Sequence, residues 1–187
     1  TITNAISSTN DSSAIDTGTN TVAVSGTLSG SNAITKKGSG TLEITGTNNL
    51  TGDAKVQEGT LKVASAAKLG SGAVSLEGGE LEVSADATIT NAISSTNDSS
   101  AIDTGGQSIT VSGALSGTGE INKVGDGTLT LTGSLNNSGG VDITAGTLVA
   151  NGSGSMPVTV TSGVLQGSGT IGNLTSSSTI EPGNSIG

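Results

Sequence analysis

Acidic side chains are the groups in this chain that could do chemistry, and they gather most densely at Glu77, Glu80 and Glu82. Glu80 and Glu82 flank Leu81, so in a β-strand their carboxylates share the outward face. Paired carboxylates can bind a cation or act as acid and base in glycan cleavage. The same residues are typical of a solvated strand face that resists unwanted contacts. We favour the solvated face, because sugar sites usually also need aromatic platforms and this chain has no aromatic residue.

Other catalytic and ligand-binding arrangements lack the residues they need. The chain contains no His and no Cys, which removes the usual proton shuttles, thiol nucleophiles and zinc ligands. Gly125-Asp-Gly127 resembles part of a calcium-binding nonapeptide, but Ser39 stands at the equivalent of Asp126. Gly38-Ser-Gly40 and Gly167-Ser-Gly169 lack the Lys-Ser/Thr of a phosphate loop. We therefore predict no catalytic, cofactor-binding or metal-binding residue, no cofactor, and a protein that is not an enzyme.

Threonine could form a further surface. Alternating threonines occur at Thr128, Thr130, Thr132, Thr159 and Thr161. Stacked on neighbouring coils they would make a hydroxyl array, which resembles the surface of β-solenoid antifreeze proteins. Glu43 replaces Thr130 in an earlier copy of the same segment, and Lys62 or Glu82 stands in adjacent coils, so we expect the array to be interrupted. Threonine is also simply a good strand residue.

Charge and hydropathy limit the partners. The formal net charge is −9, from 15 acidic residues against 6 lysines, so nucleic acid is not an expected partner. The sequence has no run of about 18 apolar residues, and we expect no membrane insertion by this fragment. Because the chain begins with Thr1 and carries no signal-like apolar core, we expect a piece of a longer polypeptide.

Short strands must position these groups. In Thr41-Leu-Glu-Ile-Thr45 and Thr128-Leu-Thr-Leu-Thr132 the apolar residues occupy every second position. A period of two is the alternation of a β-strand with one buried face. Helix signals are nearly missing, and only Val63–Leu69 is expected to make a short helical turn.

Two nested repeats organise these strands. Residues 1–18 are identical to residues 88–105, an offset of 87 that also relates Lys36 to Lys123. Within each long unit Leu42, Leu61 and Leu81 recur at spacings of 19 and 20 residues. A period near 20 made of short strands predicts a β-solenoid of roughly nine coils. We therefore predict an all-β single domain over residues 1–187, with internal repeats 1–87 and 88–187.

The period also predicts which side chains point inward. In the first repeat these are Ile2, Ile6, Ile15, Val22, Val24, Leu28, Ile34, Leu42, Ile44, Val56, Leu61, Val63, Leu69, Val74, Leu76, Leu81 and Val83. In the second they are Ile89, Ile93, Ile102, Ile109, Val111, Leu115, Ile121, Leu129, Leu131, Val141, Ile143, Leu148, Val158, Val160, Leu165 and Ile171. Asn48, Asn49, Asn136 and Asn137 are expected at corners, because Asn tolerates the left-handed backbone region.

The segment Leu115–Gly133, with the sequence LSGTGEINKVGDGTLTLTG, resembles the passenger-associated repeat of bacterial autotransporters. Val141–Ile143 and Ala145–Val149 are similar to the second strand pair of that repeat. Leu165–Leu174 and Thr179–Gly187 resemble the segment found near the end of the passenger. Residues 38–63 match less fully, and Leu50 and Ser138 stand where the repeat usually has an aromatic residue.

The resemblance implies a right-handed parallel β-helix outside the bacterial cell, either attached to the outer membrane or released. It also implies adhesion or bacterial self-association, with a protein or glycan of a host surface or neighbouring cell, or a second copy of the chain, as partner. The barrel and signal sequence of the family are not in this fragment. A structural stalk is the alternative, with an ice-binding or polysaccharide-processing solenoid less favoured.

Overall fold

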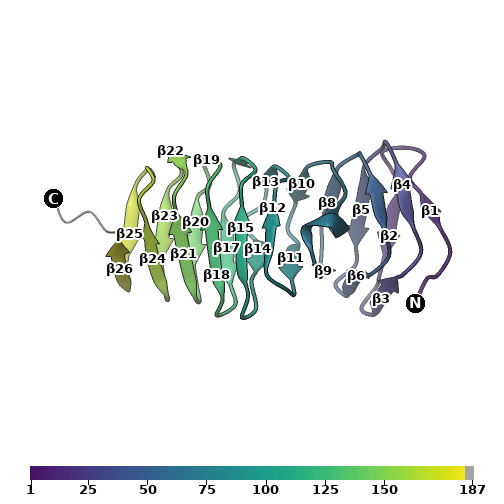
Figure 1. Cartoon of the computed structure of the whole chain (residues 1–187), viewed down its shortest axis with the longest axis horizontal. Helices are drawn as coiled ribbons and strands as arrows, with labels where there is room; N and C mark the ends of the chain where they lie inside the picture. The colour runs from purple at the N-terminus through teal and green to yellow at the C-terminus, as the bar shows by residue number, and fades with distance from the viewer. Residues whose placement is uncertain (184–187) are drawn as a thin grey trace.

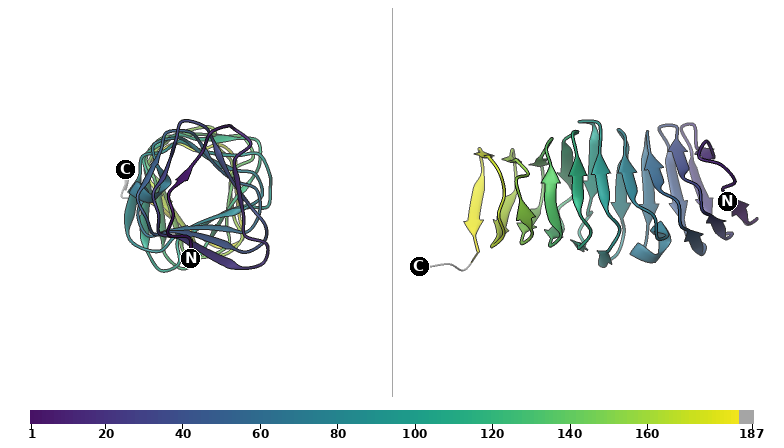
Figure 2. Two further views of the ribbon diagram at one scale, coloured as in Figure 1. Left: turned by 90° about the vertical axis from the view of Figure 1, so that its right-hand side faces the viewer. Right: turned by 90° about the horizontal axis from the view of Figure 1, so that it is seen from above.

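The computed structural model describes residues 1–183, which coil into a rod whose successive turns stack along one axis (Figure 1). Seen along the axis, the coils superpose as a rounded triangle (Figure 2). All strand pairs of the described residues are parallel, each strand hydrogen-bonding to its equivalent one coil away. The elements fall on three long faces.

The first face contains two sheets separated by the short 3-10 helix η1 (Ala66–Leu69), which contacts β7 on one side and β12 on the other. The sheet before η1 consists of β1 (Ile6–Ser7), β4 (Leu28–Gly30) and β7 (Asn48–Leu50). The sheet after it consists of β12 (Ala87–Ile89), β15 (Ser108–Val111), β18 (Thr128–Leu131), β21 (Thr147–Ala150), β24 (Val164–Gly167) and β26 (Thr179–Pro182). The predicted helical turn at Val63–Leu69 is thus a single 3-10 turn that replaces one strand.

The other two faces are continuous sheets. The second face consists of β2 (Ala14–Asp16), β5 (Ile34–Lys37), β8 (Ala54–Val56), β10 (Val74–Leu76), β13 (Ile93–Ser95), β16 (Leu115–Gly117), β19 (Ser134–Asn137) and β22 (Ser153–Gly154). The third face consists of β3 (Thr21–Val24), β6 (Thr41–Ile44), β9 (Thr60–Val63), β11 (Glu80–Val83), β14 (Ser100–Asp103), β17 (Ile121–Val124), β20 (Val141–Ile143), β23 (Val158–Val160) and β25 (Leu174–Ser176). The nine strands of the third face confirm an all-β solenoid of about nine coils, while its right-handed sense stays a prediction.

Register explains why these strands form. Leu42, Leu61 and Leu81 are direct partners across β6, β9 and β11, and all three are buried. Each coil thus covers the aliphatic row of the next, and the predicted inward set is confirmed. Its members are buried except for five that are partly buried against the core, namely Ile2, Ile6, Ile15, Val22 and Ile171. The prediction missed the buried Leu50, Leu135 and Met156.

Glycine, and not asparagine, makes the left-handed corners. No described non-glycine residue has a positive φ, so the corner role predicted for asparagine is wrong. Asn48 and Asn137 lie in strands with their side chains buried, while Asn49 and Asn136 are exposed. Gly125 shows why a corner needs glycine: its φ is 77°, and an added Cβ would meet the carboxylate of Asp103 and the backbone of Gly105.

The long repeat does not contain a whole number of coils. From β1 to its equivalent β13 the chain passes thirteen elements, twelve strands and η1, at three elements per coil. The offset of 87 residues therefore equals four coils and one further face. As a result β5, which carries Lys36, lies on the second face, whereas its equivalent β17, which carries Lys123, lies on the third.

Candidate interaction surfaces and buried polar sites

The acidic cluster lies mainly on the third face, and each of its carboxylates has a partner in the preceding coil. Glu80 and Glu82 share the outward side of β11, as predicted. Glu80 accepts a hydrogen bond from Thr60 Oγ1 at 3.2 Å, and Glu82 forms an ion pair with Lys62 at 2.5 Å. Glu77 accepts a hydrogen bond from Gln57 Nε2 at 2.9 Å.

These contacts make a ladder of side chains. Lys62 and Asp103 stand on either side of Glu82 in the strand stack. The hydrogen bond that Lys62 donates to Glu82 raises the pKa of Lys62, and burial raises the pKa of Glu80. The carboxylates are therefore held by side chains of the neighbouring coil, as on a solvated sheet surface.

The threonines form a more regular array than the sequence predicted. Thr88, Thr110 and Thr130 are consecutive partners on the outward side of the first face. Ser108, Thr128 and Thr147 form a second row beside them. The residues expected to interrupt the array, Glu43, Lys62 and Glu82, lie on the third face because of the one-face shift between repeats.

The array does have bounds. Thr159 belongs to β23 on the third face and does not join it. Val149 and Gln166 continue the row of Thr130, and Val164 continues the row of Thr147. The surface is thus a hydroxyl-rich strip that becomes partly apolar toward its C-terminal end.

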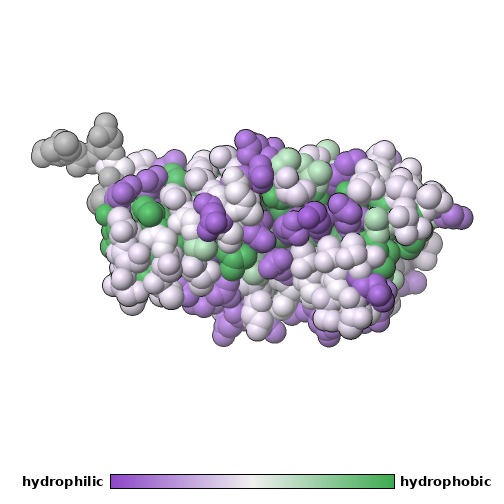
Figure 3. Space-filling model, turned by 90° about the horizontal axis from the view of Figure 1, so that it is seen from below, coloured by the Kyte–Doolittle hydropathy of each residue, from purple (hydrophilic) through white to green (hydrophobic). Residues whose placement is uncertain are grey.

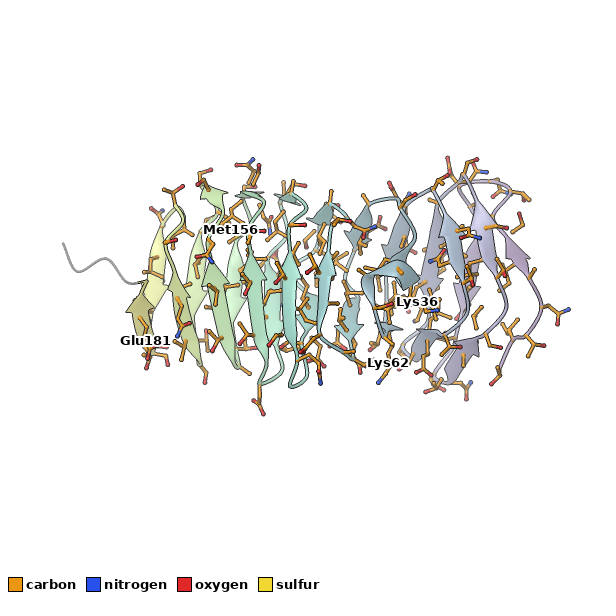
Figure 4. All side chains as sticks on the ribbon, in the orientation of Figure 1. Lys36, Lys62, Met156 and Glu181 are labelled. Atoms are coloured by element: carbon orange, nitrogen blue, oxygen red, sulfur yellow. The ribbon has the colours of Figure 1, made fainter. Side chains whose placement is uncertain are left out.

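Two lysines outside the predicted inward set point into the core. Lys123 is fully buried and Lys36 is 2% exposed (Figure 4 labels Lys36). Lys123 Nζ donates to the carbonyl oxygens of Val124, Gly125 and Ala145 at 2.9, 2.7 and 3.1 Å. Lys36 Nζ makes the equivalent bonds to Lys37, Gly38 and Glu58 at 3.0, 2.6 and 2.9 Å.

These lysines join successive coils. All three donors of the ammonium are used, two within one corner and one on the corner of the next coil. Burial lowers the pKa of Lys123 to about 8 and also lowers that of Lys36, while nearby acidic residues oppose the shift. The signal was present in the sequence, since Lys36 and Lys123 stand two residues after the inward Ile34 and Ile121.

The buried asparagines satisfy corner groups in a similar way. Asn48 Nδ2 donates to the carbonyl oxygen of Lys68 at 2.8 Å. Asn137 Nδ2 donates to those of Gly119 and Gly140, both at 3.0 Å. No buried side-chain N or O atom of the described residues lacks a hydrogen-bond partner. The buried polar side chains of residues 1–183 therefore all have hydrogen-bond partners within the fold.

The remaining predictions concern metals and membranes. Within residues 1–183 there is no group of three or more Asp or Glu side chains placed to hold a metal ion, and Asp126 of Gly125–Gly127 lies in an exposed turn. Among the described residues no helix is long and apolar enough to cross a bilayer. Of the segment Thr179–Gly187, residues 184–187 lie outside the described part.

Comparisons with known proteins agree with the repeat structure. The family described as passenger-associated-transport-repeat matches residues 34–63 and 121–150, which are the two segments that contain the buried lysines. The Adhesin BmaC autotransporter of Brucella suis biovar 1 (strain 1330) is 38% identical over 136 residues, covering 70% of this chain. The chain spans 4% of the length of that relative. No solved structure matches the chain significantly.

Proposed function

Because this chain is an autotransporter passenger segment with two passenger-associated transport repeats, we propose that it contributes to adhesion at the bacterial cell surface. Passenger segments of this kind are displayed outside the cell, attached to the outer membrane or released. The similarity to a protein named as an autotransporter adhesin carries the proposal. The partner is a protein or glycan on a host surface or neighbouring cell, or a second copy of the chain.

The geometry supports a role in binding through a long surface. A solenoid offers a continuous face many rungs long, and no cavity is needed for it to make contact. The role is non-enzymatic: the carboxylates of Glu80 and Glu82 are tied to Thr60 and Lys62 in the rung below. If the wild-type chain cleaved a glycan and a Glu80→Gln variant lost that activity, the result would support the enzyme alternative.

A display experiment tests the adhesive role. Residues 1–187 are fused to an autotransporter barrel in a non-adherent bacterial strain, and binding to cultured epithelial cells and settling of the culture are measured. We expect more binding or faster settling than with the barrel alone. A displayed, protease-resistant passenger that changes neither measurement would contradict the proposal.

A structural stalk is the second candidate, because the described coils form an uninterrupted rod (Figure 1). A stalk would hold other passenger regions at a distance without binding anything itself. Deletion of residues 1–87 from a longer passenger would then shorten its reach but preserve binding. Loss of binding after that deletion would favour the adhesive role.

We also propose that residues 1–187 form one domain of two units, 1–87 and 88–187, which a single cooperative melting transition would support.

A further inference from the structure

The outward side of the first face carries no charged residue from β12 to β24, in a chain whose net charge is −9. Its strands present two outward rows, the row of Thr110 and Thr130 and the row of Thr128 and Thr147. Asp86 and Asp126 lie in the turns along one border, and Glu181 on β26 ends the strip. Figure 3 shows another side of the rod, where hydrophilic groups are scattered along the surface. We call the strip from β12 to β24 the uncharged strip.

Comparison of the two repeats shows that this surface differs from its own duplicate. The equivalents of β15, β18, β21 and β24 in the first repeat are β3, β6, β9 and β11, which all lie on the third face. Of these, β6, β9 and β11 carry outward charges and β3 does not. Four charged outward residues there have uncharged equivalents in the strip: Glu43 and Thr130, Lys62 and Val149, Glu80 and Val164, Glu82 and Gln166. The fold accepts either type of residue at these outward positions, so packing of the core does not explain the difference.

The second face offers a useful contrast. It is also uncharged between β10 and β22, but it presents fewer outward side chains, such as Ser75, Ser94 and Ser116, in a single row. Its equivalents in the first repeat, Ser7 and Ser29, are uncharged as well. Four of the outward strand charges that are lost between the repeats therefore fall on the first face, where the contact surface is wider, and a further one, Lys37, is replaced by Val124 on the third face.

We propose that the uncharged strip is a contact surface for a second copy of this chain, an inference that rests on the proposed surface display. Acidic residues outnumber lysines 15 to 6, and two of the lysines are buried, so most approaches between copies bring like charges together. The strip avoids that repulsion. Threonine hydroxyls both donate and accept hydrogen bonds, so a threonine array can pair with itself, which an array of lysines or glutamates cannot do.

The size of the strip sets the strength of the contact. Five strands at about 4.8 Å spacing and about four residues each cover roughly 300 Å² per copy. Two copies would bury about 600 Å², less than the roughly 1,200 Å² of a stable interface. A single pair is therefore weak, and the contact acts when many copies face one another on crowded surfaces, where effective concentration is high.

Bead clustering tests the proposal on the purified chain. Beads coated in one orientation with residues 1–187 are compared with beads that carry Thr130→Glu and Val149→Glu together. The first change restores the residue found at Glu43, so the strand tolerates it. We expect wild-type beads to cluster and the variant to lose at least about ten-fold of the clustered fraction. The control carries Thr159→Glu and Thr175→Glu, which add the same charge to the third face, and it clusters like the wild type.

A charge exchange identifies the occupant. Beads with Thr130→Lys and Val149→Lys are mixed with beads carrying the two glutamates, and mixed clusters are expected although neither kind clusters alone. Wild-type beads that stay dispersed, or strip variants that cluster unchanged, would overturn the proposal. Loss of clustering without formation of mixed clusters would also overturn it, since the strip would then not face itself. If beads cluster but displaying cells neither adhere nor settle, the proposed adhesion fails and the contact between copies stands.

Discussion

A lysine ammonium inside an aliphatic solenoid is stable here because the corner carbonyls surround it. Lys123 Nζ uses its three donors on Val124, Gly125 and Ala145, so the charge is buried but hydrogen-bonded. Lys36 repeats the arrangement in the other unit. Both lie within the segments that match the transport repeat, which gives that part of the motif a physical role in joining coils.

The buried lysine predicts a pH dependence. Its pKa is about 8 in the folded chain against an ordinary value of 10.5, so between these values the unfolded chain binds more protons. Stability from this group therefore rises as the pH increases from 8 to 10.5, by at most about 1.4 kcal/mol per pH unit. Urea unfolding at several pH values should show this rise in the wild type, reduced in Lys123→Met. Lys55→Met, which removes an outward lysine, is the control and should keep the rise.

An inward leucine and an outward glutamate give a second prediction. Leu129 is 1% exposed, so Leu129→Asp places an unpaired carboxylate in the core and should cost at least about 4 kcal/mol. Glu82→Gln removes one partly exposed ion pair and should change stability by less than about 1 kcal/mol. Far-ultraviolet dichroism during heating measures both. A Leu129→Asp chain that melts like the wild type would refute the inward assignment.

At the scale of the element, the alternation of aliphatic residues predicted the strands, and their stacking is confirmed. The pattern could not tell which polar residues point inward. Alternation places Lys36, Asn48 and Asn137 on the inward side of their strands, whereas their polar side chains would ordinarily be expected at the surface. Only the carbonyls of a neighbouring coil, which the sequence does not display, make that inward position favourable. The predicted absence of a catalytic or metal site stays a prediction.

The two units serve as templates for each other, which gives a third prediction. A small cavity of about 20 Å³ in the first unit is lined by Ala54, Leu42 and Leu69, among others. The equivalent of Ala54 in the second unit is Val141. Ala54→Val should therefore fill the space and stabilise the chain by about 1 kcal/mol. Val141→Ala should destabilise it, and chemical denaturation of both variants measures the difference. A destabilised Ala54→Val chain would mean that the space cannot accept the methyl groups.

At the scale of the whole molecule, stability comes from contacts between neighbouring coils, because each strand pairs with the strands one coil away. Both ends of the described rod are less well covered than its middle: Ile2 and Ile6 are only partly buried, and Leu174 and Ile180 are 42% and 40% exposed. Local opening is therefore expected to begin at the ends. The period of about 20 residues was visible in the sequence, but the face on which each strand lies was not.

The phase between repeats gives a fourth prediction, and the absence of cysteine makes it easy to measure. Spin labels on Thr9→Cys and Thr96→Cys mark equivalent corners that differ by four coils and one face. Labels on Thr21→Cys and Ala101→Cys lie on the same face four coils apart, about 19 Å along the axis. We expect the distance between the first pair of labels to exceed that of the second pair by clearly more than the axial rise of one third of a coil. The reason is that the labels of the first pair lie on different sides of the rod. Equal distances by pulsed electron resonance would contradict the one-face shift.

The extra face in each 87-residue unit has a consequence for how such a protein lengthens. A duplication lengthens the rod and also rotates the added unit by a third of a revolution about the axis. The motifs of the added unit therefore lie on a different face from those of the original unit. Three units in tandem would place each motif once on each of the three faces of the rod. Growth by duplication thus creates new sides on which substitutions can accumulate without disturbing the original one.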